Sequence, residues 1–269
     1  HMLGEGDGAK NNAHYVEAFR QATKSTNPNA YVLGEHFFEA TQWLQGGQED
    51  GAMNYYGFAH PVRAFVAKKD IAYDPIMIGG LDFKEWLDEA RAKIPWHNQL
   101  SQLNQLDSHD TARFLSLIKG DNKRMELALI MLMTFVGVPC VYYGSEVGLE
   151  GGLDPDNRRC FPWEEVAKSK WLPIYKRWIA IRRNYPCLQS GSLQWLYASD
   201  DVLVFARQLG SEAVIVALNF SEDVQLIDIP LWKLGLNAKH LLQLCETGDK
   251  VDYRRHFSVK ITPLTSSLW

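Results

Sequence analysis

The chain has 269 residues, of which 46% are hydrophobic and 22% are charged, a composition typical of soluble globular proteins of one or two domains. A formal net charge of -4 and a pI near 6.1 argue against a nucleic-acid partner. No stretch of the chain approaches the roughly 20 apolar residues that a membrane-spanning helix needs. The sequence therefore predicts neither a nucleic-acid nor a membrane partner.

The four cysteines are widely spaced and form no C-x-x-C pair. None of them lies near histidines at the spacing of a metal site. We therefore predict free thiols and a reducing, cytoplasmic compartment.

The first two thirds of the chain alternate between helix-like and strand-like segments. Apolar residues at helical spacing predict five helices, over Asn12–Ser25, Pro61–Ala67, Leu81–Ala92, Asn122–Val136 and Leu172–Tyr185. Short apolar runs without that period predict four strands between them, over Ala30–Gly34, Ala52–Tyr56, Leu103–Leu106 and Val138–Tyr143. Strands separated by helices indicate parallel βα units, and hence an α/β fold.

Two of these predicted strands end in polar residues that could carry chemistry. Leu103–Leu106 is followed by D-S-H-D-T-A-R, which contains His109 and Asp110, and Ala30–Gly34 is followed by Glu35. Carboxyl ends of parallel strands are where α/β folds place ligands and catalysts. The aspartates and Ser108 could equally cap a following helix.

Glu35 is a candidate general acid. The residues that follow it include two phenylalanines, and aromatic rings beside a carboxyl group withhold water from it and raise its pKa. Glycoside cleavage needs a pair of carboxyl groups, one to protonate the leaving oxygen and one to meet the developing positive charge. Glu35 and Asp110 could form part of such a site.

Several blocks of sequence then resemble the alpha-amylase family of glycoside hydrolases. They are G-E-H-F at 34–37, S-H-D at 108–110, G-V-P-C-V-Y-Y-G-S-E-V-G at 137–148 and D-P-D-N-R-R-C-F-P-W at 154–163. The resemblance is strongest to the maltodextrin glucosidases of that family, in H-M-L-G-E at the start, A-M-N-Y near residue 52 and N-Q-L-D-S-H-D-T-A-R-F. It extends over nearly the whole chain.

This resemblance implies that residues 1–188 form the second half of a (β/α)8 TIM barrel. H-M-L-G-E resembles the segment that follows the family's nucleophile block, so the nucleophilic aspartate would precede His1. We expect the missing barrel half to come from another chain or from a longer protein, because a half-barrel leaves two strand edges unpaired. The alternative is a small open sheet.

The resemblance also implies roles for five residues in a retaining double displacement. Glu35 would act as the acid and then the base, and Asp110 would stabilise charge and hold glucose hydroxyls. His109 would donate to sugar hydroxyls. Arg113 could orient a carboxylate or only pack, and His36 could line an outer subsite or only lie at the solvent edge.

Beyond Pro186 the hydrophobic period changes to that of strands. Apolar residues alternate in several short runs between turn signals, which predicts an antiparallel β-sandwich over residues 189–269. It resembles the C-terminal β domain of the family. We find no catalytic candidate in it.

The leading functional prediction is an α-glucosidase acting on α-1,4-linked maltodextrins, inactive as this chain alone because it lacks the nucleophile. Alternatives are a cyclomaltodextrinase- or neopullulanase-like hydrolase of α-glucan oligosaccharides, and a non-catalytic carbohydrate-binding chain. We predict no cofactor and no metal. A homo-oligomer remains an alternative source of the missing half.

Overall fold

Four parallel strands form the sheet that carries the candidate site. The computed structural model describes residues 8–236, 240–244, 250–252 and 257–269. The strands are β1 (Leu33–His36), β2 (Gly51–Asn54), β3 (Leu103–Asn104) and β4 (Val138–Pro139). They lie in the order β1-β2-β3-β4, and every neighbouring pair is parallel. The prediction of four parallel strands in chain order is confirmed.

The strand bounds differ from the predicted ones in ways that matter for the site. β1 begins at Leu33 and includes Glu35, because its ladder to β2 starts with the pair Leu33 and Gly51. β2 ends at Asn54, whose side-chain oxygen accepts a hydrogen bond from Gly57 N at 3.1 Å and so caps the helical segment that follows. That segment therefore begins before the predicted start at Pro61.

One face of this sheet is open. The register places Glu35, Met53, Leu103 and Val138 side by side, and Leu33 shares their face because side chains alternate along a strand. Leu33 and Val138 are 43% and 42% exposed. On the other face, Gly34, Ala52 and Asn104 are buried. The sheet therefore has one face covered by the rest of the described chain and one partly apolar face that is not.

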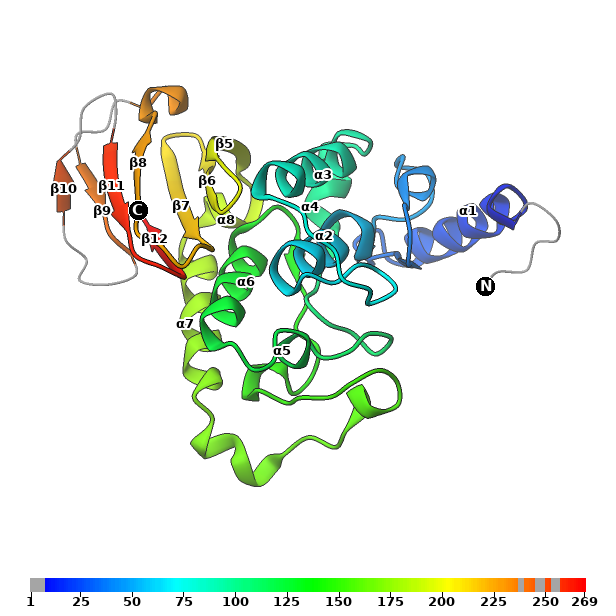
Figure 1. Cartoon of the computed structure of the whole chain (residues 1–269). Helices are drawn as coiled ribbons and strands as arrows, with labels where there is room; N and C mark the ends of the chain where they lie inside the picture. The colour runs from blue at the N-terminus through cyan, green and yellow to red at the C-terminus, as the bar shows by residue number, and fades with distance from the viewer. Residues whose placement is uncertain (1–7, 237–239, 245–249, 253–256) are drawn as a thin grey trace.

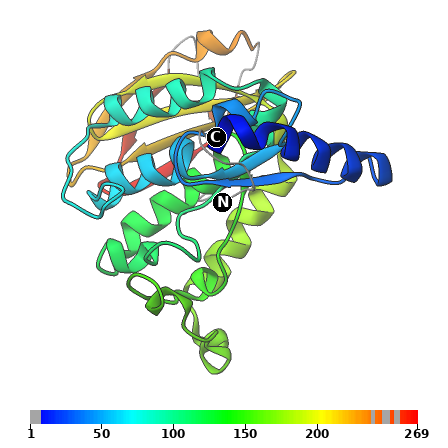
Figure 2. The same cartoon turned by 90° about the vertical axis from the view of Figure 1, so that its right-hand side faces the viewer.

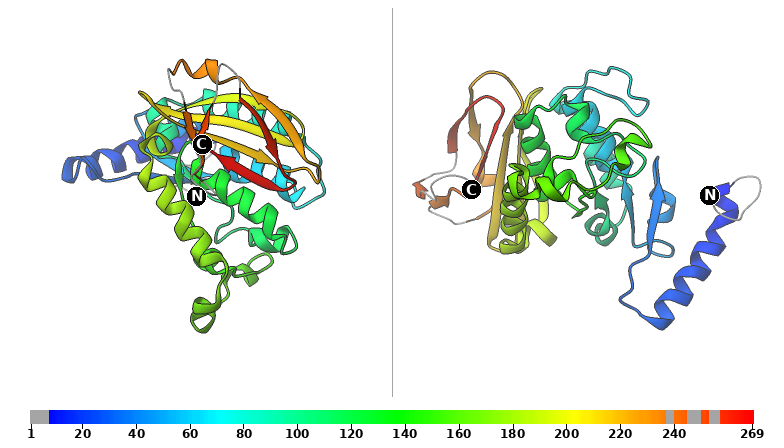
Figure 3. Two further views of the ribbon diagram at one scale, coloured as in Figure 1. Left: turned by 90° about the vertical axis from the view of Figure 1, so that its left-hand side faces the viewer. Right: turned by 90° about the horizontal axis from the view of Figure 1, so that it is seen from below.

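Helices and short turns connect the four strands along the chain. The long helix α1 extends away from the body of the chain (Figures 1 and 3), and Arg20 and Lys24 tie it to Asp50 at 2.8 Å each. The α-helices are α1 (Gly8–Thr26), α2 (His60–Val62), α3 (Gly80–Ala92), α4 (Trp96–Ser101), α5 (Phe114–Leu117), α6 (Asn122–Thr134), α7 (Trp171–Asn184) and α8 (Pro186–Ser190). Wider π-type turns, Tyr55–Ala59 and Arg63–Ala67, flank α2.

Helix α6 follows the prediction closely. Asp121 caps it by accepting hydrogen bonds from Lys123 N and Arg124 N at 3.0 and 3.1 Å. Most of its residues are buried, as the nearly all-apolar sequence predicts. The short helices α4 and α8 were not predicted, because segments of five or six residues are too short to show a helical period.

The remainder of the chain is antiparallel β structure. Its strands are β5 (Ser192–Ala198), β6 (Val202–Leu209), β7 (Glu212–Asn219), β8 (Gln225–Ile229), β9 (His240–Leu242), β10 (Lys250–Asp252), β11 (Phe257–Ile261) and β12 (Thr265–Leu268). A four-stranded sheet has the order β12-β7-β6-β5, and β11 pairs with β8 and β10 with β9. Buried side chains of β6 and β7 form a hydrophobic cluster with those of β8 and β11.

A shared core joins the two parts of the chain. Helix α3 lies against the four-stranded antiparallel sheet (Figure 2). Phe135, after α6, packs on Phe205 of β6 with ring centroids 6.0 Å apart, and Phe65 packs on Phe220 at 4.8 Å. Among the described residues, no helix combines the length and the apolar character that crossing a bilayer requires.

Arg207 of β6 is a buried charged residue at the contact between the two parts of the chain, which we call the seam. It is fully buried and donates to Thr134 O at 2.8 Å, Leu188 O at 3.0 Å and Gly191 O at 2.8 Å. Burial lowers the pKa of the guanidinium to about 9. One side chain therefore binds carbonyl groups from two segments, the end of α6 and the segment of α8 and Gly191, where the α/β part meets the β part.

We predict that Arg207→Met lowers the free energy of unfolding by about 3 kcal/mol, because buried carbonyl groups lose a charged donor and cannot reach water. Urea denaturation monitored by circular dichroism measures this. Arg183→Met is the matched control, since Arg183 is exposed on α7 and its loss should change stability by less than about 0.5 kcal/mol. Equal effects of the two substitutions would contradict the assignment.

Candidate active site

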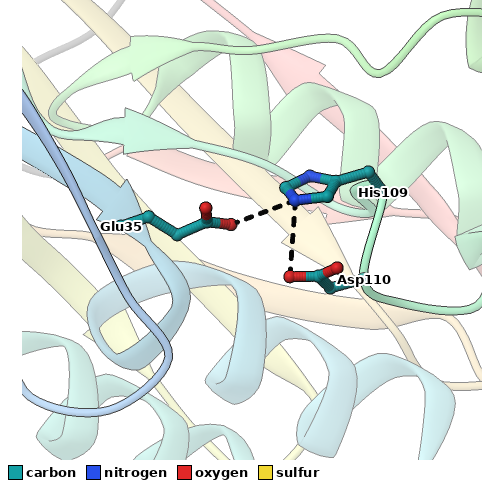
Figure 4. Close-up of side chains that lie close together, drawn as sticks. All are labelled: Glu35, His109 and Asp110. Carbon is teal, nitrogen blue, oxygen red and sulfur yellow. Dashed lines mark ion pairs between the residues drawn. The ribbon is translucent and has the colours of Figure 1, made fainter. Parts of the chain in front are cut away.

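Glu35, His109 and Asp110 meet at the carboxyl end of the parallel sheet. His109 Nε2 lies 3.4 Å from Glu35 Oε1 and 3.4 Å from Asp110 Oδ2 (Figure 4). Glu35 projects from β1, and the other two residues lie in the loop after β3. The two carboxylates are 46% and 44% exposed. The structure thus brings together three of the residues predicted for the site and leaves their polar atoms accessible.

Hydroxyl groups form hydrogen bonds with the loop that carries His109 and Asp110. Ser108 Oγ lies 2.8 Å from Tyr55 OH and accepts from Asp110 N at 3.2 Å. Thr111 Oγ1 accepts from Ser108 N at 2.9 Å. These three side chains are buried, so their hydrogen bonds are shielded from water.

Arg158 approaches the same loop from the segment after β4. Its Nε donates to His109 O at 3.1 Å and contacts Asp154 Oδ1 at 2.7 Å, and its Nη2 lies 3.5 Å from Asp110 Oδ1. These contacts place Arg158 between the loop after β4 and Asp110.

Glu35 is not shielded by aromatic rings as predicted. Phe37 instead packs on Tyr55 and His60, with ring centroids 4.6 and 5.2 Å apart, and Phe38 is 71% exposed. Because β1 continues through His36, both phenylalanines lie beyond the end of the strand. Within the described residues, water reaches Glu35 freely.

Asp107 has a structural role. Its Oδ2 accepts from Phe114 N, the first residue of α5, at 3.0 Å, and both of its oxygens accept from Ser145 Oγ. Burial raises the pKa of this carboxyl group, while its hydrogen bonds and Arg113 oppose that shift. Asp107 therefore binds the first amide of α5 without being its N-cap residue, which is Arg113, whereas Asp110 faces the site.

Arg113 does not reach the surface, which corrects its assignment to substrate binding. It is fully buried and donates to Asn157 O at 2.8 Å and to Tyr143 O at 2.6 Å. Its guanidinium lies 4.0 Å from the ring centroid of Tyr142. A side chain covered on all sides cannot contact a sugar, so Arg113 binds the loops to one another.

His36 lies beside the site but is already engaged. Its Nε2 lies 2.9 Å from both oxygens of the buried Glu49, and its ring stacks on Trp43 at 5.4 Å. The side chain is 23% exposed. A role in an outer subsite remains a prediction, and it would have to use the exposed edge of this stacked ring.

Sequence reasoning missed two residues that position the site. Tyr55 follows β2 and holds Ser108, and Ser145 joins Asp107 to Arg113, with its Oγ accepting from Arg113 Nη1 at 3.2 Å. Nothing in the local sequence distinguishes Tyr55 from a packing tyrosine.

The three site residues also have the spacing of a cation site. One ligand atom from each of Glu35, His109 and Asp110 lies within 4.8 Å of the other two. Exposed acidic groups commonly lie this close without a cation. That the chain binds no metal stays a prediction.

Comparison with known proteins identifies both parts of the chain. Residues 6–192 match the model of the alpha amylase catalytic domain, and residues 191–267 match the alpha-amylase C-terminal domain. A cyclomaltodextrinase of Geobacillus thermopakistaniensis is 36% identical over 235 residues, which cover 86% of this chain and 38% of the relative. Neopullulanase 2 of Thermoactinomyces vulgaris is 34% identical over 236 residues, covering 87% and 38%.

A solved structure shows the same arrangement. The debranching enzyme of Nostoc punctiforme superposes with a TM-score of 0.85 at 34% identity, and the match covers 94% of this chain and 54% of that one. The chain therefore spans less than half the length of the two relatives named above and about half of this structure.

The buried His60, which binds the main chain just after β1, leads to a prediction for how the stability of the protein depends on pH. Its Nε2 donates to Phe37 O at 2.8 Å, and burial lowers its pKa from 6.5 to about 4. The unfolded chain therefore binds a proton between pH 6.5 and 4 that the folded chain does not. The free energy of unfolding should be unaffected above pH 6.5 and fall below it, by at most about 1.4 kcal/mol per pH unit.

Denaturant midpoints at several pH values measure this slope. His60→Gln should flatten it, because the amide can still donate to Phe37 O and does not titrate. His97→Gln, at an exposed position, should keep the wild-type slope. An unchanged slope in the His60 variant would show that another group is responsible.

Proposed function

The chain belongs to the alpha-amylase family of glycoside hydrolases, and from this premise we propose that it supplies the acid/base half of a retaining α-glucan hydrolase. The proposal includes the finer architecture, the second half of a (β/α)8 barrel over residues 1–188 followed by a β-sandwich over 189–269. Support comes from the parallel sheet of β1 to β4 with its open face.

The proposal rests mainly on the observation that Glu35 and Asp110 both contact His109. A carboxylate on either side of one imidazole nitrogen, each at 3.4 Å, gives a cluster small enough to surround one sugar ring. Glu35 would protonate the glycosidic oxygen and later deprotonate the attacking water. Asp110 would stabilise the positive charge that develops on the sugar and hold its hydroxyls, and His109 would donate to a hydroxyl.

A retaining reaction needs one further carboxylate as the nucleophile, roughly 5 to 5.5 Å from the acid. We propose that it comes from the part of the relatives' length that this chain does not span. The open face that carries Leu33, Val138 and Glu35 is where that segment would pack. Closing the barrel there would also cover Glu35 and supply the exclusion of water that the described residues lack.

For the substrate, we prefer the class named by the relatives over the α-glucosidase reading. The sequence blocks suggested a maltodextrin glucosidase, but the relatives reported above are a cyclomaltodextrinase and a neopullulanase. We therefore propose short cyclic or linear α-glucans as substrates. We also propose a cytoplasmic location, supported by Cys140, Cys160 and Cys187, none of which is in a disulfide.

We predict that Glu35→Gln, in a protein containing the whole barrel, lowers kcat on maltotriose or a cyclomaltodextrin by about 10²- to 10⁴-fold, because the amide cannot donate the proton. The Kd for the sugar, measured by calorimetry, should change less than about threefold. Glu39→Gln is the control, since Glu39 is exposed, follows β1 and binds Thr41 and Lys93.

The same experiment discriminates the non-catalytic alternative. A carbohydrate-binding chain would show sugar affinity but no turnover in the unsubstituted protein. Release of glucose from maltotriose by the purified 269-residue chain would contradict the proposed need for a separate nucleophile.

A further inference from the structure

Asn157 occupies an unusual place beneath the candidate site. It lies in the turn Asp156–Arg158 of the loop after β4, where its neighbours Asp156 and Arg158 are exposed, yet it is itself 0% exposed. Buried polar side chains are normally hydrogen-bonded. We therefore expect hydrogen bonds to hold Asn157 inside this otherwise charged and exposed loop.

Those hydrogen bonds all reach the loop that carries His109 and Asp110. Asn157 Nδ2 lies 2.7 Å from His109 O, 2.9 Å from Thr111 O and 3.3 Å from Ser108 O. Only the amide nitrogen can face these three carbonyl groups, because the amide oxygen would repel them. One side chain therefore holds the main chain on both sides of Asp110.

Asn157 is in turn fixed by Arg113. The guanidinium Nε donates to Asn157 O at 2.8 Å, and its Nη1 binds Tyr143 O and Ser145 Oγ. Two of the links between the loops after β3 and β4 are therefore reciprocal. Arg113 reaches from the first loop to the main chain of the second, and Asn157 reaches from the second loop to the main chain of the first.

We propose that Asn157 is a positioning residue for the reaction, acting through the main chain of residues 108–111. The carbonyl groups that it binds set the peptide planes from which His109 and Asp110 project. A peptide rotation there moves the Asp110 carboxylate relative to Glu35, and displacement by about 1 Å can cost 10²-fold in rate. The catalytic consequence rests on the function proposed above, while the placement of His109 does not.

The chain contains a matched residue with the same chemistry and no site beside it. Asn219 at the end of β7 is also 0% exposed, and its Nδ2 lies 2.8 Å from Asp223 O, 3.3 Å from Ile261 O and 3.0 Å from Thr262 O. It holds a turn of the antiparallel part. Asn219→Asp therefore removes an equivalent buried contact to three carbonyl groups, at a place in the chain that does not contact the candidate site.

The experiment compares Asn157→Asp, Asn157→Ser and Asn219→Asp with the unsubstituted protein. In the 269-residue chain, the imidazole resonances of His109 are recorded after labelling histidine with ¹⁵N, and thermal unfolding is recorded alongside. In a protein containing the whole barrel, kcat and KM on a cyclomaltodextrin are measured below the unfolding temperature of every variant.

We expect Asn157→Asp to shift the His109 resonances and to lower kcat about 100-fold with KM changed less than threefold, because the carboxylate cannot donate twice to the carbonyl groups. Asn157→Ser, which keeps one donor, should lose less. Asn219→Asp should lower the unfolding temperature but leave the His109 resonances unchanged and kcat within twofold.

Unchanged His109 resonances in Asn157→Asp would overturn the inference, as would an equal loss of kcat in Asn219→Asp. Unfolding of both Asn157 variants while Asn219→Asp remains folded would also overturn it, since the role would then be general stability. A whole barrel without turnover in its unsubstituted form would instead refute the proposed function, and the resonances would still decide the role of Asn157.

Discussion

The parallel register of β1, β2 and β3 is the constraint on which the candidate site depends. Side chains alternate between the faces of a sheet, so a slip of one residue would turn Glu35 toward the covered face. Gly34 opposes such a slip, because a Cβ at this position would overlap the Glu49 carboxylate, which is held by His36. Packing behind the sheet thereby fixes which face the carboxylate of Glu35 occupies.

The second requirement is a loop after β3 that does not move. Buried polar groups supply it: Tyr55 and Ser108 hold it from the side of β2, and Asp107, Arg113 and Ser145 connect it to the loop after β4. Each of these five side chains makes at least one hydrogen bond within the network, which favours a single conformation of the loop. It leaves the exposed carboxylates free to meet a substrate while their supporting backbone is fixed.

The antiparallel part packs against the elements that lead to the site loops. Its sheet shares a hydrophobic core with α6 and α3, and Arg207 binds carbonyl groups at the seam. Helix α6 leads directly into β4, whose loop carries Arg158 and Asn157. The two parts matched by separate family models are therefore one packed body in the described residues, although no catalytic candidate lies in the antiparallel part.

The sequence by itself determined the longer helices, the four parallel strands and the candidate pair Glu35 and Asp110, because hydrophobic period and strand-end chemistry are local properties. It did not determine which polar residues near the site face outward. Arg113 and Asp110 are separated by only two residues in the same polar run, yet one is buried and the other exposed. Only the tertiary structure decided this, because the partners of Arg113, in the loop after β4, are brought close by packing and not by sequence.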